Sequence, residues 1–284
     1  MSIAETLQES IDQFAATPPG TAVPRAAGAV VDALLSALEA GAVRAAERDA
    51  TGRWHAVPWV KRGILLGFRI GGLVDMSPGD GGPLSFVDKD TYPARKFRVA
   101  DGIRIVPGGS TIRRGTYVSP GVVCMPPMYV NVGAWIGAGT MVDSHALVGS
   151  CAQIGERVHL SAAAQIGGVL EPINASPVVI EDDVVVGGGC GVYEGTVVRE
   201  RAVLGAGVIL TRSTPVYDLV REKIYHATAD APLEIPAGAV VIPGARTVSK
   251  PWGKDHGLSV QTPIIVKYRD DKTDAATVLE EWLR

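Results

Sequence analysis

The sequence has few cysteines and few aromatic residues. Aromatic residues make up only 6% of it, so a core built on large rings is not expected. An odd, widely spaced set of three cysteines is not a disulfide framework, and it has no paired spacing typical of metal ligands. Glycine is plentiful instead, at 34 residues, with 19 prolines. This composition favours tight turns and small side chains in a globular chain that is 46% hydrophobic and 20% charged.

Signals for membranes, secretion and polyanions are also missing from the sequence. No stretch approaches the roughly 20 apolar residues of a membrane span. The first twenty residues carry Glu5, Glu9 and Asp12 and no apolar run, which is unlike a secretory signal. The net charge of −3 gives no bulk basic excess for nucleic acid or an anionic membrane. We therefore expect a cytoplasmic protein whose partners are small molecules, with no nucleic acid and no membrane.

The first hundred residues read as a mainly helical domain. Leu7, Ile11 and Phe14 have the spacing of one helical face. The string AAGAVVDALLSALEAG also places its aliphatic residues on one face and ends at Gly41, a suitable helix terminator. A further helix is expected to begin at Pro58, because proline suits a first turn.

Two connecting segments are predicted around the last of these helices. The residues around Thr51-Gly52 predict a short hairpin before it. Residues 71–93 follow it and are rich in Gly, Pro and Asp, which predicts a connecting loop.

From residue 106 the pattern changes to an aliphatic residue at every sixth position. Six is not a helical spacing, since a helix brings apolar positions back after three and four residues. The run is interrupted once, through EPINASP, and all its members except Cys124 are Val, Ile or Leu. The column comprises Val106, Ile112, Val118, Cys124, Val130, Ile136, Val142, Val148, Ile154, Leu160, Ile166, Ile180, Val186, Val192, Val198, Leu204, Leu210 and Val216.

A triangular solenoid explains this column. Each hexad supplies a short strand with one side chain pointing inward, followed by a tight turn in which small residues fit. Three hexads close a coil of 18 residues, and coils stack by parallel hydrogen bonding about 4.8 Å apart. The repeat predicts a mainly β protein, a parallel β-helix, with the EPINASP segment pushed out of the prism.

Several strings resemble one family of hexapeptide-repeat acyltransferases, the tetrahydrodipicolinate N-succinyltransferases. These strings include WVKRGILLGFRI, MVDSHALVGSCAQIGERVHLS, IGGVLEP, VVIEDDVVVGGGCGVYEGTVV and TPIIVKYRDDKT, and they run through most of the chain in order. The resemblance implies a left-handed prism, a hand that spacing alone does not show. The domains expected are a helical domain at residues 1–100, the left-handed β-helix at 101–220 and a small C-terminal extension at 221–284.

The resemblance also implies a reaction. A succinyl group passes from succinyl-CoA, a co-substrate, to the amine of tetrahydrodipicolinate in its ring-opened form, L-2-amino-6-oxopimelate, in lysine and diaminopimelate synthesis. No tightly bound cofactor and no metal are implied. The chemistry requires a group that orients or deprotonates an ammonium, donors for the tetrahedral oxyanion, Arg groups for the acceptor carboxylates and cations for the CoA phosphates.

Two carboxylates are the predicted catalytic residues. Asp143 follows Val142 in a slot where other hexads have glycine, such as Gly137 and Gly149. The resemblance places Asp143 in the acceptor site and adds Glu194 as the second carboxylate. The alternative is that both are solvated surface acids.

The hexad count bears on how these carboxylates could meet. Faces recur every three hexads, so the Val192 hexad falls on a different face from the Val142 hexad, whether the interruption hides one hexad or two. One prism therefore cannot easily bring Asp143 and Glu194 together. A three-fold trimer can, and we expect a homotrimer with active sites between subunits.

Three arginines are candidates for binding substrate carboxylates. Arg104 matches the family's substrate-binding Arg, and Arg113 and Arg114 are weaker candidates. Adjacent residues of a strand point to opposite sides, so only one of Arg113 and Arg114 can face a site. The alternative for all of them is ordinary surface charge.

Three lysines near the end of the chain are candidates for CoA binding. They are Lys250, Lys254 and Lys267. Single lysines are more often only solvated, so the assignment depends on the resemblance.

Histidines leave a rival general base open. Many hexapeptide acyltransferases use His, whose pKa suits neutral operation. His145 and His159 lie inside the solenoid, and His145 shares a hexad with Asp143. The identity of the group that moves the proton therefore stays open.

Three other functions fit the same prism. One is a different CoA-dependent acyltransferase, such as an enzyme that uses acetyl-CoA on the same acceptor. A second is a zinc carbonic anhydrase, which would need three histidines where the solenoid has two. The third is a non-catalytic scaffold.

Overall fold

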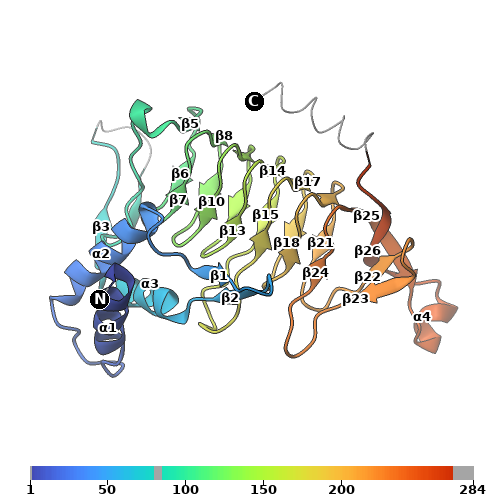
Figure 1. The fold of residues 1–284 in the computed structure, drawn as a ribbon, viewed down its shortest axis with the longest axis horizontal. Helices are drawn as coiled ribbons and strands as arrows, with labels where there is room; N and C mark the ends of the chain where they lie inside the picture. The colour runs from blue at the N-terminus through green and yellow to red at the C-terminus, as the bar shows by residue number, and fades with distance from the viewer. Residues whose placement is uncertain (1, 80–84, 271–284) are drawn as a thin grey trace.

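The computed structural model describes residues 2–79 and 85–270 as one column of stacked coils with a helical unit at one end and an extended arm at the other (Figure 1). Within these ranges no helix has the length and hydropathy to cross a membrane. Residues 271–284 of the predicted C-terminal extension lie outside the described residues.

Three helices form the unit at the start of the column, as the sequence predicts. Ser2 begins the first with a capping box, in which its side chain accepts from the N–H of Glu5 and the Glu5 carboxylate accepts from the N–H of Ser2. Ile11, Leu34 and Ile64 are fully buried where the helices meet. The helices are α1 (Ile3–Ala15), α2 (Ala27–Glu39) and α3 (Pro58–Ile70).

Two antiparallel ribbons flank α3. The predicted hairpin is confirmed as β1 (Ala46–Arg48) paired with β2 (Trp54–Ala56). The prediction of a simple loop over residues 71–93 is wrong in part, because β3 (Leu73–Asp75) pairs with β4 (Val87–Lys89). The Gly, Pro and Asp residues that suggested a loop lie mostly between and after these strands. Each strand has only three residues, too few for an alternation of apolar and polar side chains to be recognised in the sequence. Residues 80–84 lie outside the described residues.

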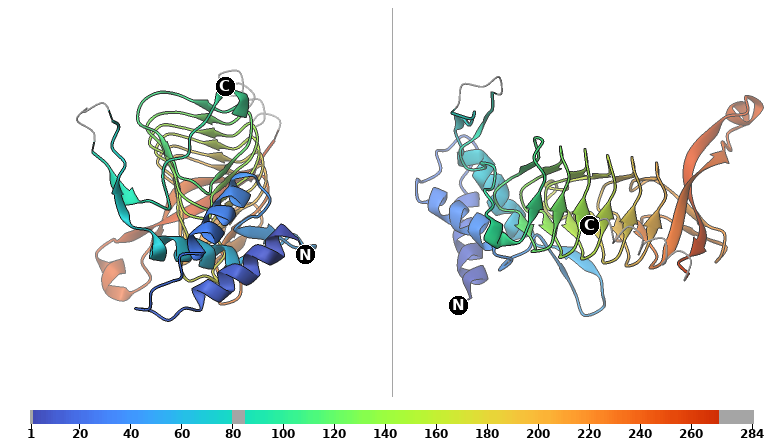
Figure 2. Two further views of the ribbon diagram at one scale, coloured as in Figure 1. Left: turned by 90° about the vertical axis from the view of Figure 1, so that its left-hand side faces the viewer. Right: turned by 90° about the horizontal axis from the view of Figure 1, so that it is seen from above.

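The column is a three-sided parallel β-helix, seen end-on in Figure 2. Met141 pairs with Val123 on one side and His159 on the other, each 18 residues away, so the predicted coil length is confirmed. The first face contains β5 (Arg104–Ile105), β8 (Val123–Cys124), β11 (Met141–Val142), β14 (His159–Leu160), β17 (Val185–Val186), β20 (Val203–Leu204) and β25 (Ala239–Thr247). The second face contains β6 (Thr111–Ile112), β9 (Tyr129–Val130), β12 (Leu147–Val148), β15 (Gln165–Ile166), β18 (Gly191–Val192) and β21 (Ile209–Leu210). The third face contains β7 (Tyr117–Val118), β10 (Trp135–Ile136), β13 (Gln153–Ile154), β16 (Val179–Ile180), β19 (Val197–Val198) and β24 (Glu234–Ile235).

Three corners join these faces. We call the turns from the first to the second face the first corner, those from the second to the third face the second corner, and those from the third back to the first face the third corner. Asp143 lies on the first corner, Glu194 on the second and Asp182 on the third.

The predicted aliphatic column fills the interior of the prism. Every member from Ile112 to Leu210 is buried in one continuous core. Val106 is wrong as its first member: Ile105 pairs with Cys124 and points inward instead. The reason is one extra residue in the turn that follows, where Gly108 and Gly109 both have positive φ.

Val216 is also wrong as a prism position, although it is buried. It begins β22 (Val216–Asp218), which pairs with β23 (Lys223–Tyr225) and with β26 (Ser259–Tyr268). The strand that stacks on β19 is β24, after a long excursion of the chain. A six-residue count could not detect this, because Val216 keeps the spacing while the backbone has already left the coil.

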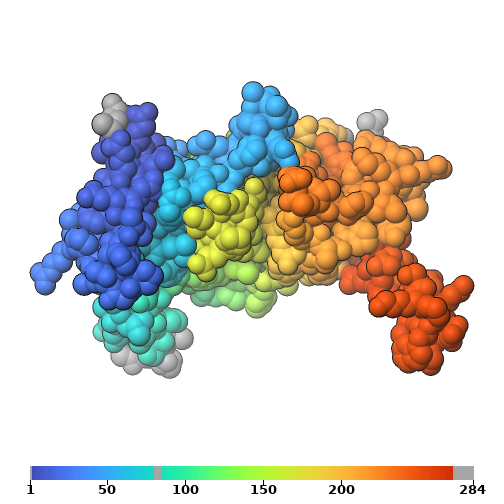
Figure 3. Space-filling model, turned by 90° about the horizontal axis from the view of Figure 1, so that it is seen from below, coloured from blue at the N-terminus to red at the C-terminus, as the bar shows by residue number. Residues whose placement is uncertain are grey.

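A two-stranded arm ends the described chain. β25 joins the first face at its start, continues past the first corner and pairs antiparallel with β26. The short helix α4 (Pro251–Asp255) connects the two strands at the tip, and the arm projects from the prism in Figures 2 and 3. A 3-10 turn, Val99–Asp101, precedes β5 at the opposite end. The domain boundaries at residues 100 and 220 stay predictions.

Candidate functional site

Asp143 lies in the turn that follows β11. One oxygen of its carboxylate, Oδ1, accepts the N–H of Ser144 at 2.7 Å. The other, Oδ2, lies 3.9 Å from Nε2 of His159. The Asp143 side chain is 29% exposed, so a second molecule can still reach it. The position combines a fixed carboxylate with an imidazole on the next coil.

His159, not His145, is the histidine that faces Asp143. His145 is exposed and occupies a left-handed corner position with φ of 61°, a conformation in which His is enriched among non-glycine residues. The left-handed backbone conformation at this corner is therefore sufficient reason for a His at position 145. His159 stands one residue before a column position, so its side chain points outward beside Met141. The 18-residue period could have predicted this neighbour, because 141 and 159 differ by one coil.

Arg104 shares the first face with Asp143 and His159. β5 and β11 are separated by one strand, β8, so Arg104 and Met141 lie two coil steps apart, or about 10 Å. Arg104 is exposed and pairs in register with Val123, which puts its side chain on the outer surface of the same sheet. The structure therefore brings Asp143 and His159 together and places Arg104 on the same outer surface, three strands before His159.

Glu194 lies on the second corner in a strained turn. Its φ is 54°, and Gly195 after it is also left-handed, with φ of 76°. Within the described coils, the other non-glycine residues with positive φ stand three places after a column position, whereas Glu194 stands two after Val192. A non-glycine residue in this region costs about 1–3 kcal/mol and tends to occur at functional sites. The Glu194 carboxylate accepts the N–H of Arg212 at 2.8 Å.

The segment pushed out of the prism supports this second corner. Its residue Ser176 comes so close to Gly195 that a Cβ there would lie 2.7 Å from the Ser176 carbonyl oxygen. The neighbouring Ala175 accepts a 2.5 Å hydrogen bond from Nζ of Lys61, a fully buried side chain of α3. Burial lowers the pKa of Lys61. The helical unit thus holds the segment that abuts the Glu194 turn.

A single chain does not bring Asp143 and Glu194 together. Val142 belongs to the first face and Val192 to the second, as the hexad count predicts. The two carboxylates also belong to different coils, because β12 follows β11 in its coil and β18 lies two strands beyond β12 on the second face.

Arg113 and Arg114 are both engaged by the helical unit and its ribbon. Arg113 pairs with the Asp88 carboxylate and lies over the ring of Phe68, 5.5 Å from its centroid. Arg114 pairs with Asp32 of α2 at 2.5 Å. These contacts fix the helical unit to the prism, and neither arginine is grouped with Asp143.

The three lysines lie along the arm. Lys250 and Lys254 are exposed at its tip, on either side of the start of α4. Lys267 lies at its base, in register with Val240 and 3.3 Å from the Asp270 carboxylate. The arm therefore spreads the lysines apart, and only Lys267 adjoins the first face.

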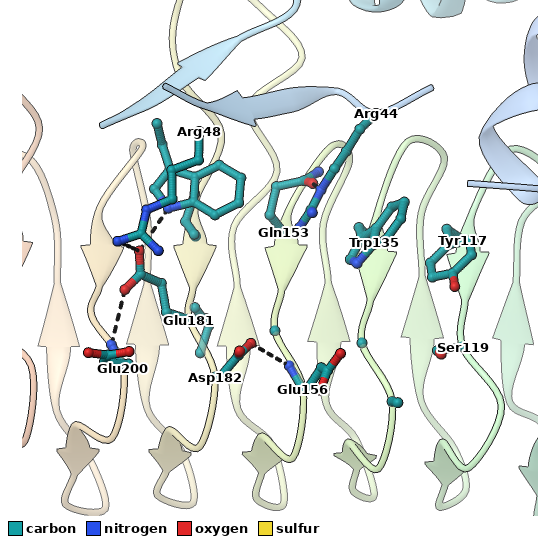
Figure 4. A pocket seen from close by; sticks show the side chains of 16 residues that line it. Arg44, Arg48, Tyr117, Ser119, Trp135, Gln153, Glu156, Glu181, Asp182 and Glu200 are labelled. Carbon is teal, nitrogen blue, oxygen red and sulfur yellow. Dashed lines mark hydrogen bonds and ion pairs between the residues drawn. The ribbon is translucent and has the colours of Figure 1, made fainter. Parts of the chain in front are cut away.

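A separate cavity lies on the third face, between that face and the β1–β2 hairpin (Figure 4). Its volume is about 310 Å³. Arg44 enters it from the hairpin side, 4.2 Å from the ring centroid of Trp135 and 5.1 Å from that of Trp54. Its Nε donates to Gln153 at 2.5 Å. Burial lowers the pKa of Arg44 to about 10.

Acidic side chains line the third corner at the other side of this cavity. Glu181 is nearly buried and accepts from Nε1 of Trp54 and from Arg199, each at 2.9 Å. Asp182 accepts the N–H of Glu156 at 2.8 Å. This cavity is not among the sequence predictions, yet the sequence carries a signal for it. Outward positions one coil apart carry Tyr117, Trp135 and Gln153, which is unusual in a chain so poor in rings.

Groups of His, Cys, Asp and Glu suited to a metal ion are not found among residues 2–79 and 85–270. The three cysteines are buried and unpaired with one another. Burial raises the pKa of Cys151 and Cys124, in each case to about 12.

Comparison with known families gives two matches. Residues 5–70 match a profile described as the N-terminal region of tetrahydrodipicolinate N-succinyltransferase. Residues 177–212 match one described as the hexapeptide repeat of succinyl-transferase.

Curated relatives cover nearly the whole chain. A 2,3,4,5-tetrahydropyridine-2,6-dicarboxylate N-succinyltransferase of Albidiferax ferrireducens is 41% identical over 289 residues, covering 99% of this chain and 100% of the relative. Proteins of the same name from Polynucleobacter asymbioticus and Nitrobacter hamburgensis are 42% and 43% identical, each covering 89% of this chain and 88% and 89% of their own length.

A solved structure gives the fold alone. It comes from Campylobacter jejuni and is assigned as a 2,3,4,5-tetrahydropyridine-2-carboxylate N-succinyltransferase. It matches with a TM-score of 0.56 at 18% identity, covering 88% of this chain and 64% of that chain.

Proposed function

The chain belongs to the 2,3,4,5-tetrahydropyridine-2,6-dicarboxylate N-succinyltransferase family, and from that premise we propose that it transfers a succinyl group from succinyl-CoA to the amine of ring-opened tetrahydrodipicolinate. The reaction belongs to lysine and diaminopimelate synthesis, and we place it in the cytoplasm. The observation that carries the assignment to a site is the contact of Asp143 with His159 beside the first face, whose outer surface also carries Arg104.

The acceptor amine is expected to bind at the first corner. An ammonium fits beside the Asp143 carboxylate, whose Oδ1 is already fixed by the N–H of Ser144. A substrate carboxylate fits Arg104, whose fork can bind both oxygens. Loss of the ammonium proton then leaves the amine lone pair free to attack the thioester carbonyl. His159, 3.9 Å from Asp143, is placed to share that proton.

The donor is expected to lie along the first corner toward the arm. Beyond Asp143 the corresponding turn positions of the next coils are small, with Ser161, Gly187 and Gly205. Small residues let an extended chain approach the backbone, and exposed N–H groups can bind a thioester oxyanion. Lys267, and Lys250 and Lys254 at the tip, are our candidates for the CoA phosphates.

A trimer would complete the site. The outward side chains of the first face are largely aliphatic and only half-buried, including Met141, Val185 and Val203. Such a stripe suits contact with a second copy. We therefore expect a homotrimer of left-handed prisms in which Glu194 of one subunit approaches Asp143 of the next.

A thiol-release assay tests the reaction. Free CoA should appear from succinyl-CoA only when the acceptor is present, and mass spectrometry should show an N-succinyl product. Acetyl-CoA in place of succinyl-CoA distinguishes the rival donor. Thiol release from acetyl-CoA alone, or from neither donor, would contradict the proposal.

A mixing experiment tests the shared site. Asp143→Asn and Glu194→Gln subunits are each expected to be inactive, and refolding them together should restore part of the activity, because some interfaces then carry both intact carboxylates. Sedimentation gives the oligomeric state of each sample. An active monomer, or mixed trimers without restored activity, would reject the shared site while leaving the assayed reaction intact.

A further inference from the structure

We propose that the cavity on the third face is a binding site for a linear amino acid that carries a carboxylate at one end and an ammonium at the other. The proposal goes beyond the succinyl-transfer reaction and does not depend on it. The cavity lies on a different face from Asp143 and is lined by a different set of residues.

The surroundings of Arg44 favour an anionic group on the ligand. The Arg44 guanidinium is stacked against two indole rings and hydrogen-bonded to a neutral amide, that of Gln153. Among the described residues, no carboxylate lies within ion-pair distance of Arg44. A guanidinium withdrawn from water in this way is normally paired with an anion. A ligand carboxylate would supply that anion, and the planar fork of Arg44 suits it.

The acidic corner opposite Arg44 favours a cationic group on the ligand. Glu181 is fully used by Trp54, Arg199, the N–H of Glu200 and Arg48, which also lines the cavity, so it is structural. Asp182 uses one oxygen for the N–H of Glu156. The Glu200 side chain makes no hydrogen bond or ion pair within the described residues. Asp182 and Glu200 therefore have acceptors left for an ammonium.

Aromatic side chains also line the cavity. Figure 4 shows Gln153, Trp135 and Tyr117 side by side along the third face, in that order away from the acidic corner. Trp135 and Tyr117 are stacked, with ring centroids 3.8 Å apart. Arg44 and Tyr117 cover the two faces of the Trp135 indole, so a ligand chain can contact only its edge. The cavity volume of about 310 Å³ is at the small end of ligand pockets. A ligand with one charge only would leave either Arg44 or the acids without a partner.

Titration calorimetry on the full chain tests this inference with four small probes. 5-Aminopentanoate and 6-aminohexanoate carry both charges, one at each end, whereas hexylamine and hexanoate each carry one. The two-charge probes should bind about tenfold or more tightly than either one-charge probe, which is the effect of losing one charged contact. Absence of binding by all four probes at millimolar concentration, or equal binding by hexylamine and 6-aminohexanoate, would overturn the proposal.

Three variants locate the binding. Arg44→Gln and Asp182→Asn should each weaken 6-aminohexanoate binding by about tenfold or more. Arg53→Gln is the matched control: Arg53 lies between β1 and β2, contacts the carbonyl of Asp230 and does not line the cavity, so binding should be unchanged. Unchanged binding in Arg44→Gln would refute the site. If Arg44→Gln does not fold, the comparison of the four probes on the unaltered chain still tests whether the site requires both charges.

The Asp143→Asn variant separates this inference from the proposed function. It should bind 6-aminohexanoate normally, because Asp143 does not line the cavity. Loss of binding in this variant would show that the probe occupies the acceptor site, which contradicts a second site and not the reaction.

Discussion

The first and third faces of the prism have the same interior and opposite exteriors. Inside, both present buried aliphatic residues, such as Val142 and Ile154. Outside, the third face is covered by the hairpin, and its outward residues Gln153, Val179 and Val197 are buried. The outward residues of the first face, apart from the nearly buried Val123, remain at least partly exposed. The last strand of this face, β25, continues into the arm that leaves the column.

This difference shows which residues specify the fold and which are free for other tasks. The inward residue of each hexad is fixed by the narrow interior. The outward and corner residues are not, so one side can carry a covering domain and another a reaction site. Each prediction below tests this division, from the largest expected effect to the smallest.

The largest effect is expected at the first corner. Asp143→Asn keeps the shape of the side chain but removes the charge that orients the acceptor ammonium. Turnover should fall by about 10²–10⁴-fold, the range for loss of a positioned acid or base. Steady-state assays with succinyl-CoA measure it.

Asp183→Asn is the matched control for this change. Asp183 is also a corner acid, but it lies on the third corner and is paired with Arg157. Its turnover should equal that of the parent. Similar losses of turnover in both variants would mean that removal of any corner carboxylate lowers activity, which would contradict a specific role for the first corner.

The interior should respond more strongly than the exterior to loss of a side chain. Ile154→Ala removes a fully buried group and should lower the free energy of unfolding by about 2–5 kcal/mol. Ile209→Ala, at an outward position of the second face, should lower it by less. Urea titrations at a fixed protein concentration compare the two, since association would also affect stability. Equal losses would contradict the assignment of inward and outward positions.

A smaller effect is expected under the hairpin. Glu181→Gln weakens the contacts that the buried carboxylate makes with Trp54 and Arg199. The expected loss of stability is about 1–3 kcal/mol, the cost of a poorly satisfied buried polar group. Glu194→Gln, exposed at the second corner, should leave stability nearly unchanged. A larger loss of stability in Glu194→Gln than in Glu181→Gln would contradict the structural role assigned to the Glu181 carboxylate.

The smallest effect concerns pH. Hydrogen bonds from Arg157, at 2.8 and 2.9 Å, hold the pKa of Asp183 below its ordinary value of 3.8. The carboxylate therefore stabilises the fold above that ordinary value, and the contribution is lost as pH falls through the lowered pKa. Both groups are well exposed, so the contribution should be about 1 kcal/mol or less. Thermal unfolding of Asp183→Asn and the parent should differ near pH 7 and converge in acid.

Much of the prism could be predicted because its interior repeats. The narrow triangular interior of the prism accepts only a small or medium-sized apolar side chain at the inward position of each hexad. The sequence shows this requirement from Ile112 to Leu210. The rule fails where the backbone changes without changing the spacing. The extra residue in the turn after β5 moved the inward position from Val106 to Ile105, and Val216 kept the count after its strand had left the coil.

The sites were harder to predict because they depend on the outward residues. His145 stands next to Asp143 in the hexad, but the 18-residue coil makes His159 the neighbour in space. Arg113 and Arg114 pair with carboxylates of the β3–β4 ribbon and of α2, which sequence spacing does not place. Their role as substrate ligands stays a prediction. The Arg44 cavity forms between two such distant parts, and no local motif marks it.

The number of stacked coils also sets the distance between sites along the axis of the prism. Four strand-to-strand steps separate β11, which precedes Asp143, from β25, where the arm starts, a length of about 19 Å along the axis. An inserted or deleted triplet of hexads would change that length by about 4.8 Å while every inward contact kept its type. A prism of this kind can therefore be fitted to acyl carriers of different reach in whole increments, without redesign of its core.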